Sequence, residues 1–507
     1  MLKFDVKKTI ILFLALFCGV FSGAAQDSFR VGDTLAYAAQ KSRTRLSKYQ
    51  PFRSPVYDST LIQGSKYGSF ADIFDWLPGT FYFDRGSIGQ CAEGFLFGGI
   101  PSFFVLDYDG LILNDPITGT VDLNLVPTES VGQMGIVLSS ADKASLFHAV
   151  GQTLRIKSLD MASLPIRSRV AYRTGTGFDD NDVRLGVQVT PVLTINMGGI
   201  LKNYAGTQFH SKYRAQKVNV KIDRTFKDLH IRYVFLMNKF DLDIPYAENY
   251  NVADEFRLPH KKDVRYDHGL IIEKGHFISR LQYTTLRREF YGYRHSVVDQ
   301  LHNSDFLRLD NQYVLATPVA DVGITVRGNW SRLKSNEWGN RTHWDMQGMV
   351  SLERVVRHNL FVAGELALEK ANNYNQSLQP AVNAVWLIKQ GLKFHAWYSR
   401  RSVFPDFASL YSTGPFRLGD KNLVRGHLDQ VGTAINYATA SSNVNIAGTI
   451  QRFKNPITLS PADPGIGEQD SKSYQYSQAD VFDRFSLHFS SRLKIHRFWS
   501  VVSKANF

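Results

Sequence analysis

The feature that most limits the fold of this chain is a repeated alternation of apolar and polar residues from about residue 167 onward. In 216–223, Val218, Val220 and Ile222 alternate with lysine, asparagine and aspartate. A period of two places each set on one face of a β-strand. The same pattern recurs in 229–238, 343–353, 392–399 and 443–451. The sequence therefore predicts a large antiparallel β-structure.

Two features favour a membrane barrel over a soluble sandwich, which shows the same alternation. The strands read as about 10 to 13 residues long, which suits a tilted membrane span better than the soluble average. Their polar faces carry full charges, as a wet lumen allows. A sheet in hydrocarbon must close on itself, because unpaired backbone groups there are costly. We predict a transmembrane antiparallel β-barrel with about 17 strands, within a range of about 16 to 18.

The start of the chain indicates export. Three lysines precede the apolar run 10–20, and small residues follow at 22–25, so 1–25 reads as a secretory signal peptide. No later stretch reaches the roughly 18 apolar residues of a membrane helix. Removal of the signal would leave Cys91 as the only cysteine, so no disulfide within the chain is expected. We expect Cys91 to be an inert thiol in a protein core.

Residues 69–160 carry an ordered set of local motifs. Apolar residues at helical spacing precede Pro78-Gly79, which ends a helix. Asp109-Gly110 is a strong hairpin turn. A segment at 121–127 and a glycine-marked strand at 151–156 follow. The helical positions are Phe70, Ile73, Phe74 and Leu77.

This order of motifs resembles the plug domain of TonB-dependent outer-membrane receptors. A second match lies in 404–411 and 419–423, which resembles a "P-F-eLY … GN-L" segment of that family's barrels. The sequence departs from the segment at Asp420-Lys421-Asn422, where the family usually has Gly-Asn. The resemblance implies an N-terminal α+β plug at 69–160 inside the lumen of a barrel at 161–507.

The resemblance also implies a function. Such a receptor binds a scarce solute, such as a metal chelate, an anion or another nutrient, on its outer face. It imports the solute with energy from a TonB-type inner-membrane protein, and it needs no enzyme chemistry and no cofactor. We expect 26–68 to be a periplasmic extension or linker, with 33–37 and 57–61 as candidate contacts for the coupling protein. The family's barrel has 22 strands, so we weigh a complete barrel of 16 or 18 strands against one whose last strands are missing, and favour the latter.

The spacing of turns agrees with a barrel. Short connections are predicted near Pro191, Lys227-Asp228, Lys274-Gly275, Pro318, Arg357, Gln390-Gly391 and Ser441-Ser442. Long ones are predicted at 239–262, 290–303, 402–426 and 454–479. Long external loops alternating with short periplasmic turns are typical of outer-membrane barrels.

No catalytic motif stands out. Asp107 and Asp109 form a carboxylate pair, but we expect them to shape the hairpin turn. His295, Asp299 and His302 share a predicted external loop that could hold a metal, although a solvated loop is the simpler interpretation. No phosphate-binding loop, dinucleotide fingerprint or nucleophile elbow is present.

The net charge of +13 leaves several partners open. Export and the lack of a recognition module argue against nucleic acid. Cations predicted to face the lumen suggest an anionic or metal-chelate ligand, diluted by acidic residues on the same faces. A passive plugged porin and a surface adhesin or scaffold barrel are the alternative functions. The cations are Arg169, Arg173, Lys217, Lys221, Arg232, Arg308 and Lys393, and the acids are Asp223, Asp310, Asp345 and Glu353.

Overall fold

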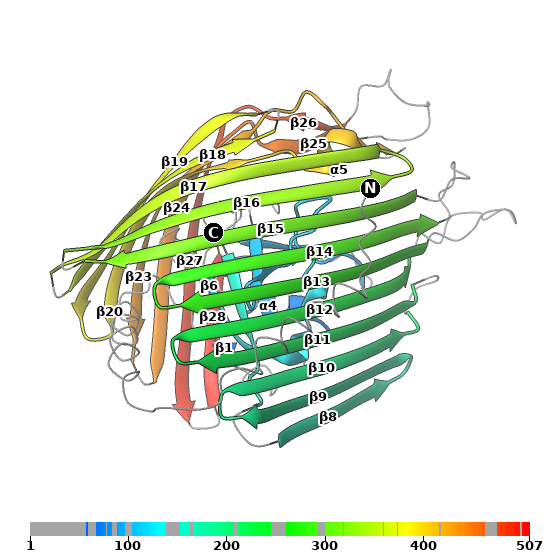
Figure 1. Cartoon of the computed structure of the whole chain (residues 1–507), viewed down its shortest axis with the longest axis horizontal. Helices are drawn as coiled ribbons and strands as arrows, with labels where there is room; N and C mark the ends of the chain where they lie inside the picture. Colours follow the sequence, from blue (N-terminus) through cyan, green and yellow to red (C-terminus); the bar gives the residue numbers. More distant parts are fainter. Residues whose placement is uncertain are drawn as a thin grey trace, which may run out of the picture. The chain divides into compact units, whose positions relative to one another are not determined.

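Seventeen long strands form a closed barrel in the computed structural model of the chain (Figure 1). The structure describes residues 57–58, 67–77, 79–83, 89–96, 104–137, 153–162, 166–206, 211–244, 260–291, 300–317, 319–357, 359–372, 374–414, 417–439, 441–461, 474–496 and 499–506. All of them belong to one compact unit, Leu46–Phe507. The predicted signal peptide and the candidate coupling segment 33–37 lie outside the described residues.

The barrel strands follow one another around the ring in chain order, and their number confirms the predicted range. They are β8 (Ile166–Gly175), β9 (Phe178–Thr190), β10 (Leu193–Tyr204), β11 (Tyr213–Phe226), β12 (Leu229–Asp243), β13 (His260–Lys274), β14 (Phe277–Tyr291), β15 (Gln300–Ala316), β16 (Asp321–Ser335), β17 (Gly339–Arg357), β18 (Leu360–Ala371), β19 (Tyr374–Lys389), β20 (Leu392–Val403), β23 (Gly426–Ala438), β24 (Ser442–Lys454), β27 (Phe482–His496) and β28 (Trp499–Asn506).

The ring closes where β28 lies beside β8. All sixteen pairings between successive strands are antiparallel. An odd number of strands linked in this way makes the first and the last run in the same direction. The closing pair therefore differs from the even-numbered, fully antiparallel ring usual in single-chain bacterial barrels.

The barrel buries polar residues on its inner face and exposes apolar residues on its outer face. On β17, Val350 and Leu352 are 53% and 51% exposed, whereas Asp345 is 4% exposed. On β11, Lys217 and Lys221 are buried on the lumen side of the wall. A water-soluble protein buries the opposite set of residues, so this distribution confirms the predicted barrel with an apolar exterior.

The connections follow the predicted alternation. Turns of two residues join β9 to β10, β11 to β12, and β13 to β14. At the other end, the predicted loop 239–262 is shorter than expected, because β12 continues to Asp243 and β13 begins at His260. The long connection 404–425 contains helix α5 (Phe407–Tyr411) and strands β21 (Thr413–Gly414) and β22 (Arg417–Leu418). β22 joins a small sheet with β25 (Ile457–Pro461) and β26 (Tyr474–Gln478).

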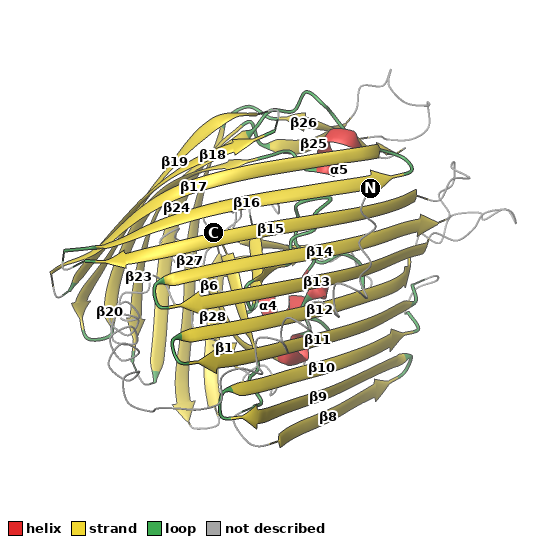
Figure 2. Cartoon of the chain, viewed as in Figure 1, coloured by secondary structure: helices red, strands yellow, loops and turns green. Residues whose placement is uncertain are grey.

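A small α+β unit, here called the plug, is made by the elements between 57 and 162. Its main sheet has the order β1-β6-β7-β4-β5, and β2 pairs with β3. Figure 2 shows helices only in the plug region and at α5 among the described residues. The plug elements are β1 (Tyr57–Asp58), α4 (Phe70–Phe74), β2 (Thr80–Phe83), β3 (Glu93–Leu96), β4 (Val105–Tyr108), β5 (Leu111–Ile112), the 3₁₀ turns η2 (Leu123–Leu125) and η3 (Thr128–Ser130), β6 (Val131–Val137) and β7 (Thr153–Ser158).

Helix α4 forms where the spacing predicted it. The Ser69 side chain caps the start of α4 by accepting from the Ala71 amide, and the Asp72 carboxylate accepts from the Ser69 amide. Phe70 and Phe74 are fully buried and pack into the plug core. No helix in the described part of the chain is long and apolar enough to cross a membrane.

Candidate functional site

The contact between plug and barrel is the candidate functional site, and it begins at the β4–β5 hairpin. The Gln282 side chain of β14 bonds both backbone groups of Ile112 in this hairpin: its Oε1 accepts from the Ile112 amide at 2.9 Å, and its Nε2 donates to the Ile112 carbonyl at 2.8 Å. Arg265 of β13 donates to the Leu113 carbonyl at 2.9 Å. Asp267 holds this guanidinium through an ion pair of 2.9 Å. The barrel wall thus pairs with the plug backbone much as a neighbouring strand would.

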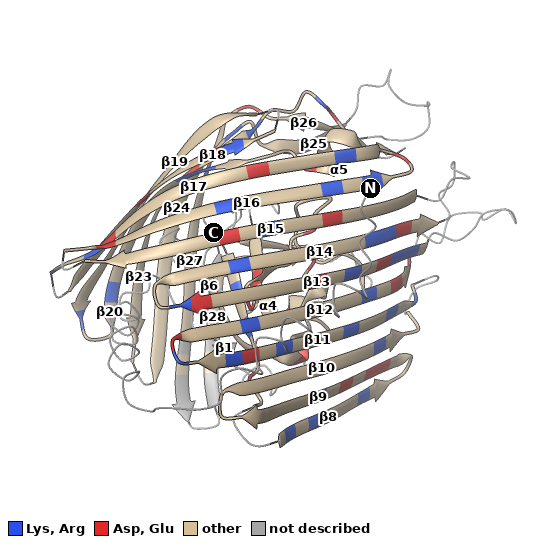
Figure 3. Ribbon diagram, viewed as in Figure 1, with Lys and Arg blue, Asp and Glu red and all other residues tan. Residues whose placement is uncertain are grey.

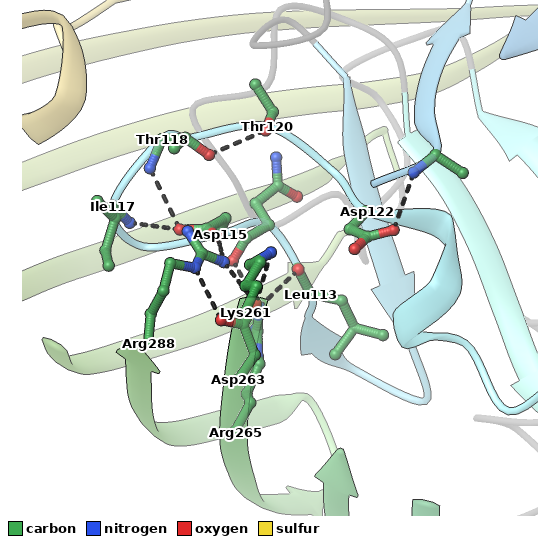
Figure 4. Close-up of polar contacts among 12 residues, drawn as sticks. Leu113, Asp115, Ile117, Thr118, Thr120, Asp122, Lys261, Asp263, Arg265 and Arg288 are labelled. Atoms are coloured by element: carbon green, nitrogen blue, oxygen red, sulfur yellow. Dashed lines mark hydrogen bonds and ion pairs between the residues drawn. The ribbon is translucent and has the colours of Figure 1, made fainter. Parts of the chain in front are cut away.

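A second contact surrounds Asp115, at the end of the hairpin (Figure 4). Arg288 of β14 reaches Asp115 at 2.7 Å and Asp263 of β13 at 3.0 Å, and Lys261 meets Asp263 at 2.9 Å. Asp115 also accepts from the Ile117 amide at 2.7 Å, which shapes the plug loop. Burial raises the pKa of Asp115, but Arg288 and the Ile117 amide outweigh it and hold the pKa below its ordinary value.

A third contact lies at η2 and η3. Arg173 of β8 meets the buried Glu129 carboxylate at 2.7 Å, and Lys202 of β10 approaches it at 3.4 Å. Burial raises the pKa of Glu129, but Lys202 and the other nearby cations lower it to about 2. The Lys217 ammonium of β11 donates to the Asn124 carbonyl in the middle of η2 at 2.5 Å. Cations from β8, β10 and β11 therefore hold this corner of the plug.

The fourth contact comes from the long connection after β20. The Ala408 amide of α5 donates to the Ile117 carbonyl of the plug at 3.2 Å. Ile117 and Phe407 share a buried cluster with Leu286 and Leu333 of the barrel. Asp406 caps α5 by accepting from the Ser409 amide at 2.7 Å. Burial raises the pKa of Asp406 to about 7 despite that bond.

These contacts lock a folded unit into the lumen through ion pairs, backbone readout and apolar packing. They include no arrangement of nucleophile, base and oxyanion donor. No group of His, Cys, Asp and Glu among the described residues could hold a metal ion. These contacts keep the plug in the lumen, and they must break before the plug can move.

Solved structures share the overall fold of this chain. No family model and no curated protein matches the sequence. The siderophore receptor PirA of Pseudomonas aeruginosa matches with a TM-score of 0.70 and 13% identity, over 89% of this chain and 84% of that one. A ferric enterobactin receptor (PfeA) from the same organism, in complex with enterobactin, gives 0.73 and 11%, over 90% and 81%. The copper transporter OprC gives 0.70 and 12%, over 89% and 79%.

The fold is that of the TonB-dependent receptors. The plugged barrel predicted from the motifs at 69–160 is thus confirmed as a fold. Identities of 10–13% carry the comparison no further than architecture.

The structure finds partners for several of the cations that suggested an anionic ligand. Arg173 and Lys217 hold the plug. Arg232 pairs with Asp223 at 2.7 Å, and Arg308 pairs with Asp310 at 3.1 Å. Lys221, Asp345 and Glu353 are buried on the inner face of the wall, and Arg169 is partly buried on β8. Lys393 lies at the short-turn end of β20. These pairs remove most of the electrostatic reason for an anionic ligand.

The other singled-out residues have structural positions. Asp107 accepts from the Gly110 amide at 2.7 Å and shapes the turn as expected, whereas the Asp109 side chain accepts from the Ser158 amide of β7 at 3.1 Å. His302 is not in a loop: it lies in β15, buried with its ring 4.5 Å from that of Trp338. His295 and Asp299 lie outside the described residues. Cys91 is partly exposed.

Sequence reasoning missed the residues that do most of the holding. Gln282, Arg265 and Arg288 were not singled out, although the alternation of β13 and β14 marks them as inward-facing. The sequence pattern does not show which inward-facing residues lie opposite the plug. Tyr57 and Asp58, expected in the extension, instead pair with β6 and extend the plug sheet.

Proposed function

We propose that this protein is an outer-membrane receptor that binds a scarce solute on its outer face and imports it with energy from an inner-membrane coupling protein. The observation that carries the proposal is the occupied lumen: the plug is held by buried ion pairs on several strands, so passage requires work on the plug. Breaking a buried ion pair is strongly unfavourable, which favours an energised step over free diffusion. The solute passes without covalent change, and the apolar outer face contacts membrane lipid.

The structural neighbours give only a broad guide to the class of solute that this protein would import. Two neighbours are named for siderophore or ferric enterobactin reception and one for copper transport. Scarce metals and their chelates are therefore the first solutes to test.

The test uses deletion strains supplied with ferric enterobactin, other ferric siderophores or copper ions. Uptake that needs both this protein and the coupling protein supports the proposal. Uptake that persists without the coupling protein, together with solute leakage through reconstituted liposomes, would instead identify a passive porin. Unchanged uptake with lost surface attachment would identify a scaffold.

A further inference from the structure

The inner surface of the barrel has two walls of different chemistry. The first, here called the charged wall, is the inner face of β9–β15. Its buried charged residues include Asp182, Arg184, Lys217, Arg265, Asp267, Arg308 and Asp310. Figure 3 shows such charges along the strands of this side. The polar contacts to the hairpin and to η2 start from this wall.

The second wall, here called the neutral wall, is the inner face of β19, β20, β23 and β24. Between Lys393 at the short-turn end and Arg401 at the other, its inner-facing residues include no Asp, Glu, Lys or Arg. Arg401 itself is neutralised by Glu365 at 3.0 Å. The rest are amides, hydroxyls and small residues, together with His395 and larger apolar side chains such as Trp397 and Phe453. Gln430 and Gln451 lie opposite each other on adjacent strands, and Ser399 lies opposite Gln430.

The neutral wall keeps buried polar atoms without hydrogen-bond partners. Gln430 and Gln451 are 0% and 1% exposed, yet neither amide atom of either side chain has a partner in the described structure. The same holds for Asn383 Nδ2, Ser399 Oγ, Trp397 Nε1 and Asn445 Oδ1. Buried polar groups in native proteins are nearly always bonded to protein, water or ligand. On the neutral wall these atoms belong to uncharged groups, and Ser399, Gln430 and Gln451 lie side by side, which fits a surface that meets water or a solute.

The plug touches this wall through weaker contacts. Trp397, Ala434 and Ala447 belong to the same buried cluster as the plug core. Trp397 lies flat over Gly432 of the next strand, where a Cβ would come within 2.1 Å of its ring. Separation here loses the packing of Trp397 and two alanines and hydrates unpaired amides. Separation at the charged wall parts Asp115 from Arg288 and Glu129 from Lys202, which leaves buried charges without these partners.

We propose that, when the plug is remodelled, it stays on the charged wall and parts from the neutral wall, so that the solute passes along the amides and hydroxyls of β19, β20, β23 and β24. This inference rests on the proposed energised import. The passage selects solutes by hydrogen bonding rather than by charge, because the surface that the solute follows is uncharged.

The test compares two buried serines at matched depth. Ser399 of the neutral wall and Ser304 of the charged wall are 3% and 2% exposed, and both hydroxyls lack partners. Each lies four residues from the end of its strand that faces the long connections. Ser399→Cys and Ser304→Cys are made in a Cys91→Ser background, and whole cells are treated with a small membrane-impermeant maleimide, with and without the coupling protein. We expect labelling of Ser399→Cys to rise several-fold in energised cells and that of Ser304→Cys to stay unchanged.

A disulfide at the charged wall gives a second arm. A Cβ on Gly269 of β13 would lie 3.3 Å from Leu111 Cγ of the plug, which is close enough for Leu111→Cys/Gly269→Cys to cross-link. We expect the oxidised tether to leave energised labelling of Ser399→Cys intact. A tether that abolishes this labelling, with recovery on reduction, overturns the inference, as does a rise at Ser304→Cys alone. Either result leaves energised import standing, whereas no coupling-dependent rise at either serine contradicts both.

Discussion

At the scale of single residues, the Gln282 side chain bonds the plug backbone as a neighbouring strand would. Gln282 accepts from the Ile112 amide and donates to the Ile112 carbonyl, which also accepts from Arg265 at 3.3 Å. Gln282→Leu leaves the buried Ile112 amide without its partner, so we expect the plug to lose about 1–3 kcal/mol of stability. Limited proteolysis of the folded barrel in denaturant measures this.

The neighbouring strand supplies a control for this change. Gln312 of β15 is equally buried, but its Oε1 has no partner. Gln312→Leu should therefore leave the plug's protease resistance near that of the wild type. Equal losses in the two variants would show that Gln282 acts through packing alone.

A second residue predicts a dependence on pH. The pKa of Glu129 falls from 4.5 to about 2 on folding. The ionised carboxylate therefore stabilises the plug above about pH 4.5, and that contribution disappears as the pH falls toward 2. We expect Glu129→Gln to be less stable than the wild type at pH 7 and to lose less stability on acidification. Denaturation monitored from pH 7 to pH 2 measures the difference. Parallel curves for the two proteins would contradict the assignment.

At the scale of elements, the β4–β5 hairpin depends on two residues with positive φ. Asp109 has φ of 51° and Gly110 of 92°, a turn that suits paired strands. A Cβ on Gly110 would also lie 2.5 Å from Ile271 Cδ1 of the barrel. We expect Gly110→Ala to destabilise the plug by more than about 1 kcal/mol. Gly348→Ala on β17, where a Cβ meets open space, is the control and should change little.

A second substitution separates the two causes of this loss, which are the strained φ of residue 110 and its close contact with Ile271. Ile271→Ala removes the close contact but leaves the strained φ in place. Combined with Gly110→Ala, it should recover part of the stability, as judged by the same protease assay. Full recovery would mean that the backbone conformation contributes nothing.

The sequence could predict several elements but not the contacts between them. Helix α4, the Asp109-Gly110 turn and the alternating strands were predictable because each depends on residues close together in sequence. The contacts of Arg265 with Leu113, or of Lys217 with Asn124, join residues far apart in the chain. No local pattern reveals which wall the plug meets. Trp397 shows the limit well: its apolar side chain faces inward, against the outward rule, because it packs with the plug core.

At the scale of the whole molecule, the barrel inverts the burial of a soluble protein and divides its interior between two tasks. Apolar side chains cover the outside, charges on one inner wall hold the plug, and uncharged polar groups line the other. Each surface can therefore change independently of the others. Substitutions on the outer face should alter insertion into the membrane without touching the plug.

The outer face gives the last prediction. Val350 lies near the midpoint of β17 and is 53% exposed. An arginine at the middle of a bilayer destabilises a barrel by about 2–4 kcal/mol, so Val350→Arg should lower folding into lipid vesicles by that amount. Met349→Arg places the same charge one residue away on the lumen side, where Glu365 and Glu369 lie two positions from its cross-strand partner Ala367 and can accommodate it. Folding is followed by the gel shift between folded and heated barrel. A smaller effect for Val350→Arg than for Met349→Arg would mean that β17 does not present this face to lipid, and the apolar exterior would then need a protein partner instead.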